Sequence, residues 1–226
     1  MKNTLLYSFI GISVVYLLII FLGREDLAWY LKPFLLPFLL LTVYSFENFP
    51  SKGILLTALS FSWIGDIVLM FAEKGELYFI IGLVAFLISH VFYIVLFLRQ
   101  SKETNAMKIP LFWLSFIVVL LYLNTMLSLL FPTLGGLKIP VSVYAATISL
   151  MLIIALKGYF EWKNTARYFI LIGALSFVIS DSLLAINKFH SPLPEASFWI
   201  MITYLAAQFC ITSGILKLNQ KNSVSF

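Results

Sequence analysis

The chain has 226 residues, of which 62% are hydrophobic and 11% are charged, and its formal net charge is +5. Soluble domains carry roughly 25% charged residues, so this composition excludes an ordinary soluble protein. Continuous apolar runs also exclude a membrane β-barrel, whose strands alternate apolar and polar residues. The positive charge lies mostly in loops, where Lys and Arg set membrane topology, and it does not indicate binding to nucleic acid.

The apolar runs predict an all-α polytopic transmembrane helical bundle of about eight helices, since a helix needs about 20 such residues to cross the bilayer. Turn-forming or charged residues separate the runs. No soluble segment is long enough to form a second domain, so residues 1–226 are expected to be a single integral membrane domain. The predicted spans are 4–22, 29–46, 53–72, 77–99, 109–130, 138–157, 166–187 and 196–216.

The first two spans carry signals at their starts. Residues 4–22 follow Lys2 as in a signal peptide, but no small-residue cleavage site precedes Arg24. We therefore interpret this run as a transmembrane helix. Lys32 opens the second span and is expected near the membrane surface, where it either contacts a substrate or simply extends to the interface.

Two aspartates interrupt spans that otherwise have the composition of lipid-facing helices. Asp66 lies in the third span and Asp181 in the seventh. A carboxylate at membrane depth costs about 2.5–3.5 kcal/mol on insertion scales and normally faces a bundle interior or a wet cavity. The two spans run in the same direction, so both aspartates are expected at similar depth, in the half away from the termini. They either form a shared catalytic site or act as structural polar groups that fix helix register.

Further polar residues accompany the aspartates. Lys188 follows Asp181 by seven residues on one helix face, about 10 Å higher at ~1.5 Å per residue. His90 lies mid-span in the fourth helix and is either a site residue or a hydrogen-bonded packing residue. The candidate substrate-binding residues are Lys32, His90, Tyr93, Tyr144, Asn187, Lys188, Tyr204 and Gln208.

No metal site is predicted. Catalytic zinc usually takes three protein ligands rich in His or Cys, and no spacing in the chain resembles such a motif. Asp66, Asp181 and His90 could chelate an ion only as an unusual set. The single cysteine, Cys210, cannot form an intrachain disulfide.

A short pattern occurs in both halves of the chain. The segments 65–69 and 180–184 share a small residue, Asp, any residue, an aliphatic residue and Leu. A parallel four-plus-four internal repeat would produce this similarity.

The distribution of Lys and Arg predicts the orientation. Ten of the 15 lie on the side of the termini and five on the other, which places both termini in the cytoplasm, with a bacterial inner membrane as the expected location. The ten are Lys2, Lys52, Arg99, Lys102, Lys108, Lys157, Lys163, Arg167, Lys217 and Lys221, and the five are Arg24, Lys32, Lys74, Lys138 and Lys188.

An ordered set of short motifs resembles the lysoplasmalogenase family, the YhhN-like multi-pass membrane proteins. The matching residues occur in the same order and with similar spacing over most of the chain. They are Lys32-Pro33, Gly65-Asp66 with Leu69-Met70, Gly82-Leu83 with Phe86, His90 and Tyr93, then Tyr144, the run from Ser180 to Ala185 with Asn187 and Phe189, and Tyr204 with Gln208.

The resemblance implies an enzyme that hydrolyses the vinyl ether bond of a lysoplasmalogen to a fatty aldehyde and a glycerophospho-alcohol. This chemistry needs one carboxylic acid and one carboxylate, much as glycoside hydrolysis does, and Asp66 and Asp181 fit these roles without assigning which is the acid. The substrate would be a lysophospholipid from the membrane, with its phosphate near Lys32 and Lys188. No cofactor and no soluble protein partner are implied, and the oligomeric state stays open.

The alternative is a proton-coupled transporter or lipid carrier, which would also use intramembrane aspartates. Broken helices with paired Gly or Pro interruptions would favour it, and only Pro33 and Pro37 mark a span in this way. A structural or assembly role leaves the two aspartates unexplained. If the source organism lacks plasmalogens, the substrate would be another ether lipid or lysolipid.

Overall fold

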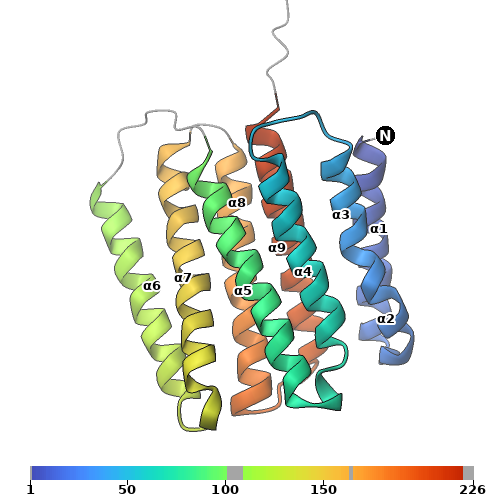
Figure 1. The fold of residues 1–226 in the computed structure, drawn as a ribbon, viewed down its shortest axis with the longest axis vertical. Coiled ribbons are helices and arrows are strands. Elements are labelled where there is room, and N and C mark those ends of the chain that lie inside the picture. The colour runs from blue at the N-terminus through green and yellow to red at the C-terminus, as the bar shows by residue number, and fades with distance from the viewer. Residues whose placement is uncertain (1, 101–108, 163–164, 221–226) are drawn as a thin grey trace, which may run out of the picture.

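The computed structural model describes residues 2–100, 109–162 and 165–220. In these ranges the structure is helical and contains no β-strand, and eight helical segments are long and apolar enough to cross a membrane. The predicted all-α bundle is therefore confirmed. The helices are α1 (Lys2–Phe21), α2 (Glu25–Leu31), α3 (Leu35–Tyr44), α4 (Lys52–Leu69), α5 (Glu76–Leu98), α6 (Ile109–Leu130), α7 (Lys138–Glu161), α8 (Ala166–Ala185) and α9 (Ala196–Leu218) (Figure 1).

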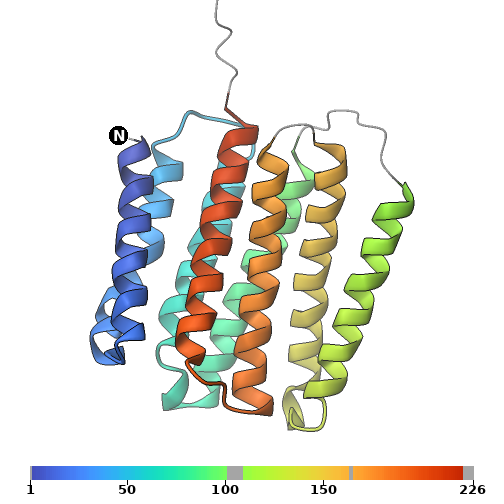
Figure 2. The same ribbon diagram turned by 180° about the vertical axis from the view of Figure 1, so that it is seen from behind.

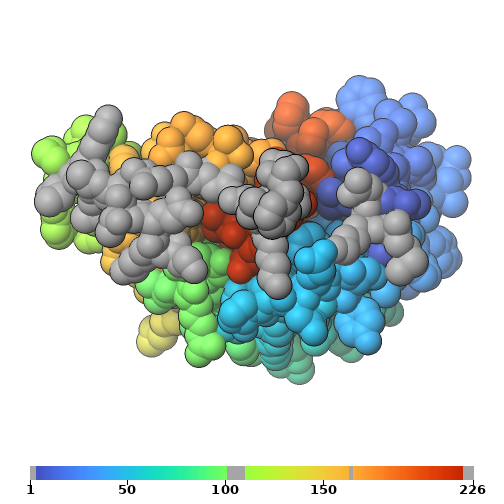
Figure 3. Space-filling view, turned by 90° about the horizontal axis from the view of Figure 1, so that it is seen from above, coloured from blue at the N-terminus to red at the C-terminus, as the bar shows by residue number. Residues whose placement is uncertain are grey.

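Successive spans run up and down, so that α1 begins and α9 ends at the same end of the bundle (Figures 1 and 2). The closest helix pairs are α4 with α5 and α8 with α9. Seen from the end that holds the termini, the molecule is elongated, with α6 at one edge and α1 to α3 at the opposite edge (Figure 3). The two aspartate-bearing helices, α4 and α8, each belong to one of the tight pairs.

Glycines permit this close packing. A Cβ atom on Gly65 of α4 would lie 2.6 Å from the Phe86 ring of α5, and one on Gly173 of α8 would lie 2.7 Å from the Ile211 side chain of α9. Small residues let membrane helices approach closely and gain van der Waals contacts. The backbones that carry Asp66 and Asp181 are thereby fixed against their neighbours.

The second span is interrupted. A 3-10 turn at Lys32–Phe34 separates α2 from α3. The carbonyl of Pro33 would normally accept a bond from the residue four positions later, but that residue is Pro37, which has no N–H. The indole nitrogen of Trp63 donates to this carbonyl instead, at 2.7 Å. The apolar span runs from Glu25 to Tyr44 and Lys32 lies inside it, so the expectation that Lys32 opens the span is wrong.

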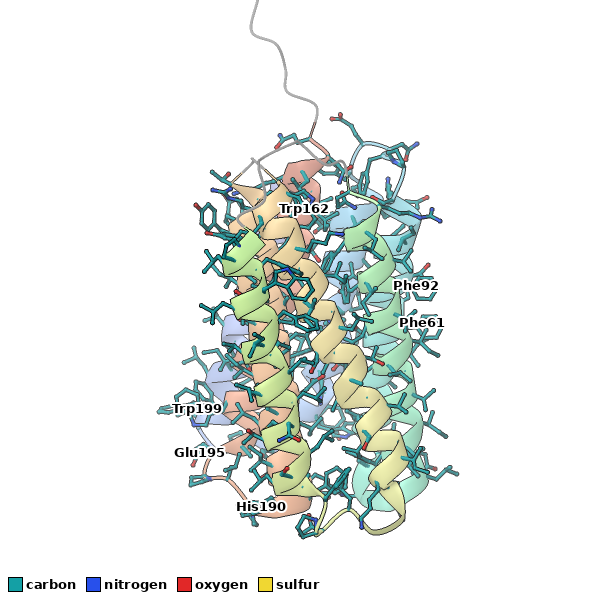
Figure 4. All side chains as sticks on the ribbon, turned by 90° about the vertical axis from the view of Figure 1, so that its left-hand side faces the viewer. Phe61, Phe92, Trp162, His190, Glu195 and Trp199 are labelled. Atoms are coloured by element: carbon teal, nitrogen blue, oxygen red, sulfur yellow. The ribbon has the colours of Figure 1, made fainter. Side chains whose placement is uncertain are left out.

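Exposed aromatic residues gather near both ends of the bundle, as they do at membrane interfaces. In Figure 4, the exposed Trp199 lies toward the end that holds His190 and Glu195. These belts and the apolar spans identify the chain as an integral multi-pass membrane protein. The exposed Trp and Tyr residues are Trp29, Tyr30, Tyr78 and Trp199 near one end and Tyr7, Tyr44, Trp113 and Tyr168 near the other.

Candidate active site

Asp66 and Asp181 line one cavity of about 310 Å³. Several lining residues lie near the last residues of α4 and α8, and both helices end at the side of the bundle away from the termini. This volume is within the range of small-molecule sites. Apolar walls from α4, α5, α8 and α9 surround a polar interior. The polar lining residues are Tyr16, Lys32, Asp66, Glu73, Ser180, Asp181, Asn187, Lys188, Ser197 and Tyr204.

Asp66 is held by a tyrosine from another helix. Its side chain comes from α4 and is 4% exposed, and the hydroxyl of Tyr204 on α9 donates to its carboxylate at 2.7 Å. Lys32, from the turn between α2 and α3, lines the same cavity, and its ammonium interacts electrostatically with the Asp66 carboxylate. The break in the second span thus brings a positive charge toward Asp66.

Asp181 has a similar partner. The hydroxyl of Tyr144 on α7 donates to Oδ2 of Asp181 at 2.5 Å. Nε2 of His90 lies 3.8 Å from the same oxygen, which is too long for a hydrogen bond. The Asp181 side chain is 13% exposed, and it lines the same cavity as Asp66.

His90 lies behind Asp181 rather than in the cavity. Its side chain is fully buried, with its ring edge-on to Phe177 at 4.6 Å and to Tyr144 at 5.4 Å between centroids. Among the described residues neither ring nitrogen has a hydrogen bond of normal geometry, although the Phe86 backbone one turn earlier interacts with the ring. The structure therefore does not bring His90 into contact with the cavity, where a substrate-binding residue was expected.

Tyr93 and Gln208 belong to a buried hydrogen-bond network outside the cavity. Tyr93 donates to Oε1 of Gln208 at 2.6 Å, and Nε2 of Gln208 donates to Ser62 at 2.9 Å. Ser62 and Ser89 are joined by a further bond of 2.7 Å. Both predicted residues are fully buried. Their polar groups connect α4, α5 and α9, and the structure does not place them where the sequence predicted substrate contact.

Asn187 and Lys188 do line the cavity. They lie in a π-helical segment, Ile186–His190, that continues α8. Oδ1 of Asn187 accepts a bond from the backbone N–H of Leu193 at 2.9 Å, and the Lys188 ammonium lies 5.4 Å from the centre of the Phe79 ring. These contacts fix both side chains at the mouth of the cavity.

Four polar residues that line the cavity were not among the predicted site residues. Ser180 directly precedes Asp181 in the motif shared with the lysoplasmalogenase family, so the sequence could have indicated it as a site residue. Tyr16 lies on α1, and Glu73 and Ser197 lie at helix ends, and nothing in their local sequence marks them. Within the described ranges, no group of three His, Cys, Asp or Glu side chains could hold a metal ion. The unusual chelating set of Asp66, Asp181 and His90 is not formed.

Comparison with known proteins gives a consistent result. The YhhN family matches residues 27–215 of the chain. Over 169 residues the chain is 33% identical to lysoplasmalogenase TMEM86A of Homo sapiens. The aligned region makes up 72% of this chain and 65% of that protein. Over 207 residues it is 30% identical to lysoplasmalogenase TMEM86B of Homo sapiens. That aligned region makes up 88% of this chain and 80% of that protein.

A bacterial relative is similar too. Over 139 residues the chain is 30% identical to a lysoplasmalogenase of Mycobacterium tuberculosis. The aligned region makes up 60% of this chain and 50% of that protein. The match therefore spans slightly less than two thirds of TMEM86A and half of the mycobacterial relative. No solved structure matches the chain.

Proposed function

The chain belongs to the YhhN family, and from this premise we propose that it hydrolyses the vinyl ether bond of lysoplasmalogens to a fatty aldehyde and a glycerophospho-alcohol. The observation that carries the proposal is one cavity that is lined by Asp66 and Asp181 from separate helices and by Lys32 and Lys188. Relatives that bear the name lysoplasmalogenase support the same reaction.

The two carboxyl groups supply what vinyl ether hydrolysis requires. One carboxylic acid protonates the β-carbon, so that the electron pair of the C=C bond forms the new C–H bond and an oxocarbenium ion results. The second carboxyl group, as a carboxylate, removes a proton from water while the water oxygen bonds to the α-carbon. The hemiacetal then releases the aldehyde. Its hydroxyl proton returns to the first carboxylate, and the second carboxyl group protonates the departing glycerol oxygen. No further reactant is consumed.

The head of the substrate would occupy the cavity mouth. Lys32 and Lys188 place two ammonium groups in the same lining, and Asn187 adds an amide. With its phosphate bound there, the substrate would extend its vinyl ether bond toward the two aspartates. The contact from Trp63 to Pro33 stabilises the turn that holds Lys32 in this position.

Replacing Lys32 or Lys188 with Gln is expected to raise KM more than it lowers kcat, because an ammonium–phosphate contact exists in both the ground state and the transition state. Steady-state kinetics with lysoplasmalogen and with a vinyl ether lacking phosphate would measure this. The neutral substrate should be indifferent to both changes. Lys138→Gln is the matched control, since Lys138 is exposed at the same end and lies outside the cavity lining. A collapse of kcat at constant KM would instead place the lysine in the chemistry.

One observation favours the alternative of a lipid carrier. The second span is broken at Lys32–Phe34 and α8 continues as a π-helix, and interrupted helices are common in transporters. Product analysis separates the two functions. Detergent-solubilised protein incubated with a panel of lysoplasmalogens and lysophospholipids should release aldehyde from the former, as detected by mass spectrometry. Intact lipids throughout the panel would reject the hydrolase, and lipid movement across sealed vesicles would then support the carrier.

We also infer that both termini face the cytoplasm of a bacterial inner membrane. The support is the excess of Lys and Arg on that side. Part of this excess lies outside the described residues, at Lys102, Lys108, Lys163 and Lys221, and the side chain of Lys2 is not described either. A reporter that fluoresces only in the cytoplasm should be bright at the C-terminus and dark when inserted at Gly135. The reverse pattern would invert the orientation, and the cavity with it.

A further inference from the structure

A second hollow adjoins the active-site candidate. It has a volume of about 50 Å³ and lies between α6, α7 and α8. Asp181 lines this hollow as well as the main cavity, and its partner Tyr144 lines the hollow too. Asp181 therefore borders both spaces.

The two spaces differ in chemistry. The main cavity presents Lys32, Lys188, Asn187 and both aspartates. Apart from Asp181, the hollow is lined by uncharged side chains, most of them aliphatic. Typical examples are Leu123, Leu127, Val141, Ala145, Ile148 and Val178. A molecule that bridged the two spaces would need one charged part and one hydrocarbon part.

The hollow is close to the bilayer. Its outer wall is α6, which forms one edge of the bundle (Figures 1 and 2). Only 11% of the apolar stretch of α6 is buried inside the protein, compared with 39% for α7. A hydrogen bond between Tyr122 of α6 and Ser182 of α8 nevertheless joins the outer wall to the helix that carries Asp181. The other α6 residues that line the hollow are Leu123, Met126, Leu127 and Leu130, so a hydrocarbon chain beside α6 would contact mainly apolar side chains.

We propose that this hollow binds the first carbons of the substrate's hydrocarbon chain, with the rest of the chain against α6 and the surrounding lipid. This inference rests on the proposed function. With the phosphate at Lys32 and Lys188 and the chain beyond Asp181, the vinyl ether lies across Asp181. The chain-side carbon of that bond is the β-carbon, which receives the proton.

The placement assigns the two catalytic roles. Asp181 faces the β-carbon and acts as the acid that forms the new C–H bond. Asp66 lies in the polar cavity with Lys32, on the side of the α-carbon, and takes the proton from the attacking water. As the hemiacetal collapses, its hydroxyl proton restores Asp181 and the proton on Asp66 passes to the glycerol oxygen. Both groups end the cycle as they began it.

Adjacent alanines on α7 provide the test. Ala145 lines the hollow, whereas Ala146 is exposed on the lipid-facing side of the helix. Ala145→Phe should lower kcat/KM for a hexadecenyl lysoplasmalogen at least about tenfold relative to a soluble ethenyl analogue, which has no carbon beyond the vinyl ether to enter the hollow, because an overfilled apolar pocket discriminates by about 10–200-fold. Ala146→Phe should keep the wild-type ratio. An unchanged ratio in folded Ala145→Phe protein, or an equal change in both variants, overturns the chain site.

A binding measurement on the wild-type protein covers the case in which Ala145→Phe fails to fold. The probe is a single-chain lysolipid with a saturated ether bond and a diazirine on the third chain carbon. Irradiation should label peptides of α6 and α7 that face the hollow, and excess lysoplasmalogen should suppress the labelling. Labelling confined to α1 and α9 rejects the site even if hydrolysis occurs. A wild-type protein that releases no aldehyde from either chain length instead rejects the proposed function on which the site rests.

Discussion

Asn in place of Asp66 or of Asp181 is expected to lower kcat for aldehyde release by about 10²–10⁴-fold, the usual effect of losing one acid–base group. Asn keeps the shape and the hydrogen bond from the neighbouring tyrosine, but it neither donates a proton to carbon nor accepts one from water. Each variant should therefore remain folded, as judged by a monodisperse gel-filtration profile and an unchanged Tm. Initial rates of aldehyde formation by the purified variants would measure the loss.

The double variant sharpens this prediction. Asp66→Asn combined with Asp181→Asn should be scarcely slower than the worse single variant, because both groups act in one reaction and their losses do not add. Multiplicative losses would indicate two independent contributions. A single variant that retains near-wild-type turnover rules out a mechanism that needs both carboxyl groups.

Loss of a tyrosine hydroxyl beside an aspartate should have the next largest effect. Tyr144 donates to Asp181 at 2.5 Å and Tyr204 donates to Asp66 at 2.7 Å. A hydrogen bond to a charged group contributes about 1.5–3 kcal/mol, so Tyr144→Phe and Tyr204→Phe should each lower kcat about 10–100-fold. The effect on KM should be small, because these hydroxyls orient the carboxyl groups and are expected to leave the phosphate contacts intact.

A matched variant separates this role from a general loss of stability. Tyr30 is 68% exposed near the same end of the bundle and lies outside the cavity lining. Tyr30→Phe should change neither kcat nor Tm. If Tyr144→Phe and Tyr204→Phe lower Tm while the folded fraction keeps full kcat, the two tyrosines support the fold and do not position the catalytic groups.

The fold and the central pair of residues were predictable from the chain because membrane burial makes both signals strong. Long apolar runs are confirmed as helices. Asp66 and Asp181 stood out because charge inside a span is costly. Their common depth followed from the direction of the helices, so the shared cavity could be foreseen. The internal repeat stays a prediction.

Other features depend on contacts that no local pattern encodes. The position of Lys32 depends on Pro33 and Pro37 together with a bond from Trp63, which is 30 residues away in the chain. A histidine in the middle of a span, such as His90, is a reasonable candidate for a site residue, yet its neighbours bury it. Tyr16 joins the cavity from α1, which precedes the region that the YhhN family matches. Only the packing of separate helices determines these outcomes.

The origin of the product oxygens tests the two-carboxyl hydrolysis most directly. Purified protein would be incubated with lysoplasmalogen in ¹⁸O-labelled water, and the glycerophospho-alcohol and aldehyde would be identified by mass spectrometry. The account predicts aldehyde release with no ¹⁸O in the glycerol, because water attacks the α-carbon and the glycerol C–O bond stays intact. It also predicts no cleavage of the saturated ether analogue, and almost no aldehyde from Asp66→Asn or Asp181→Asn. Label in the glycerol, or aldehyde release by either variant at the wild-type rate, would contradict it.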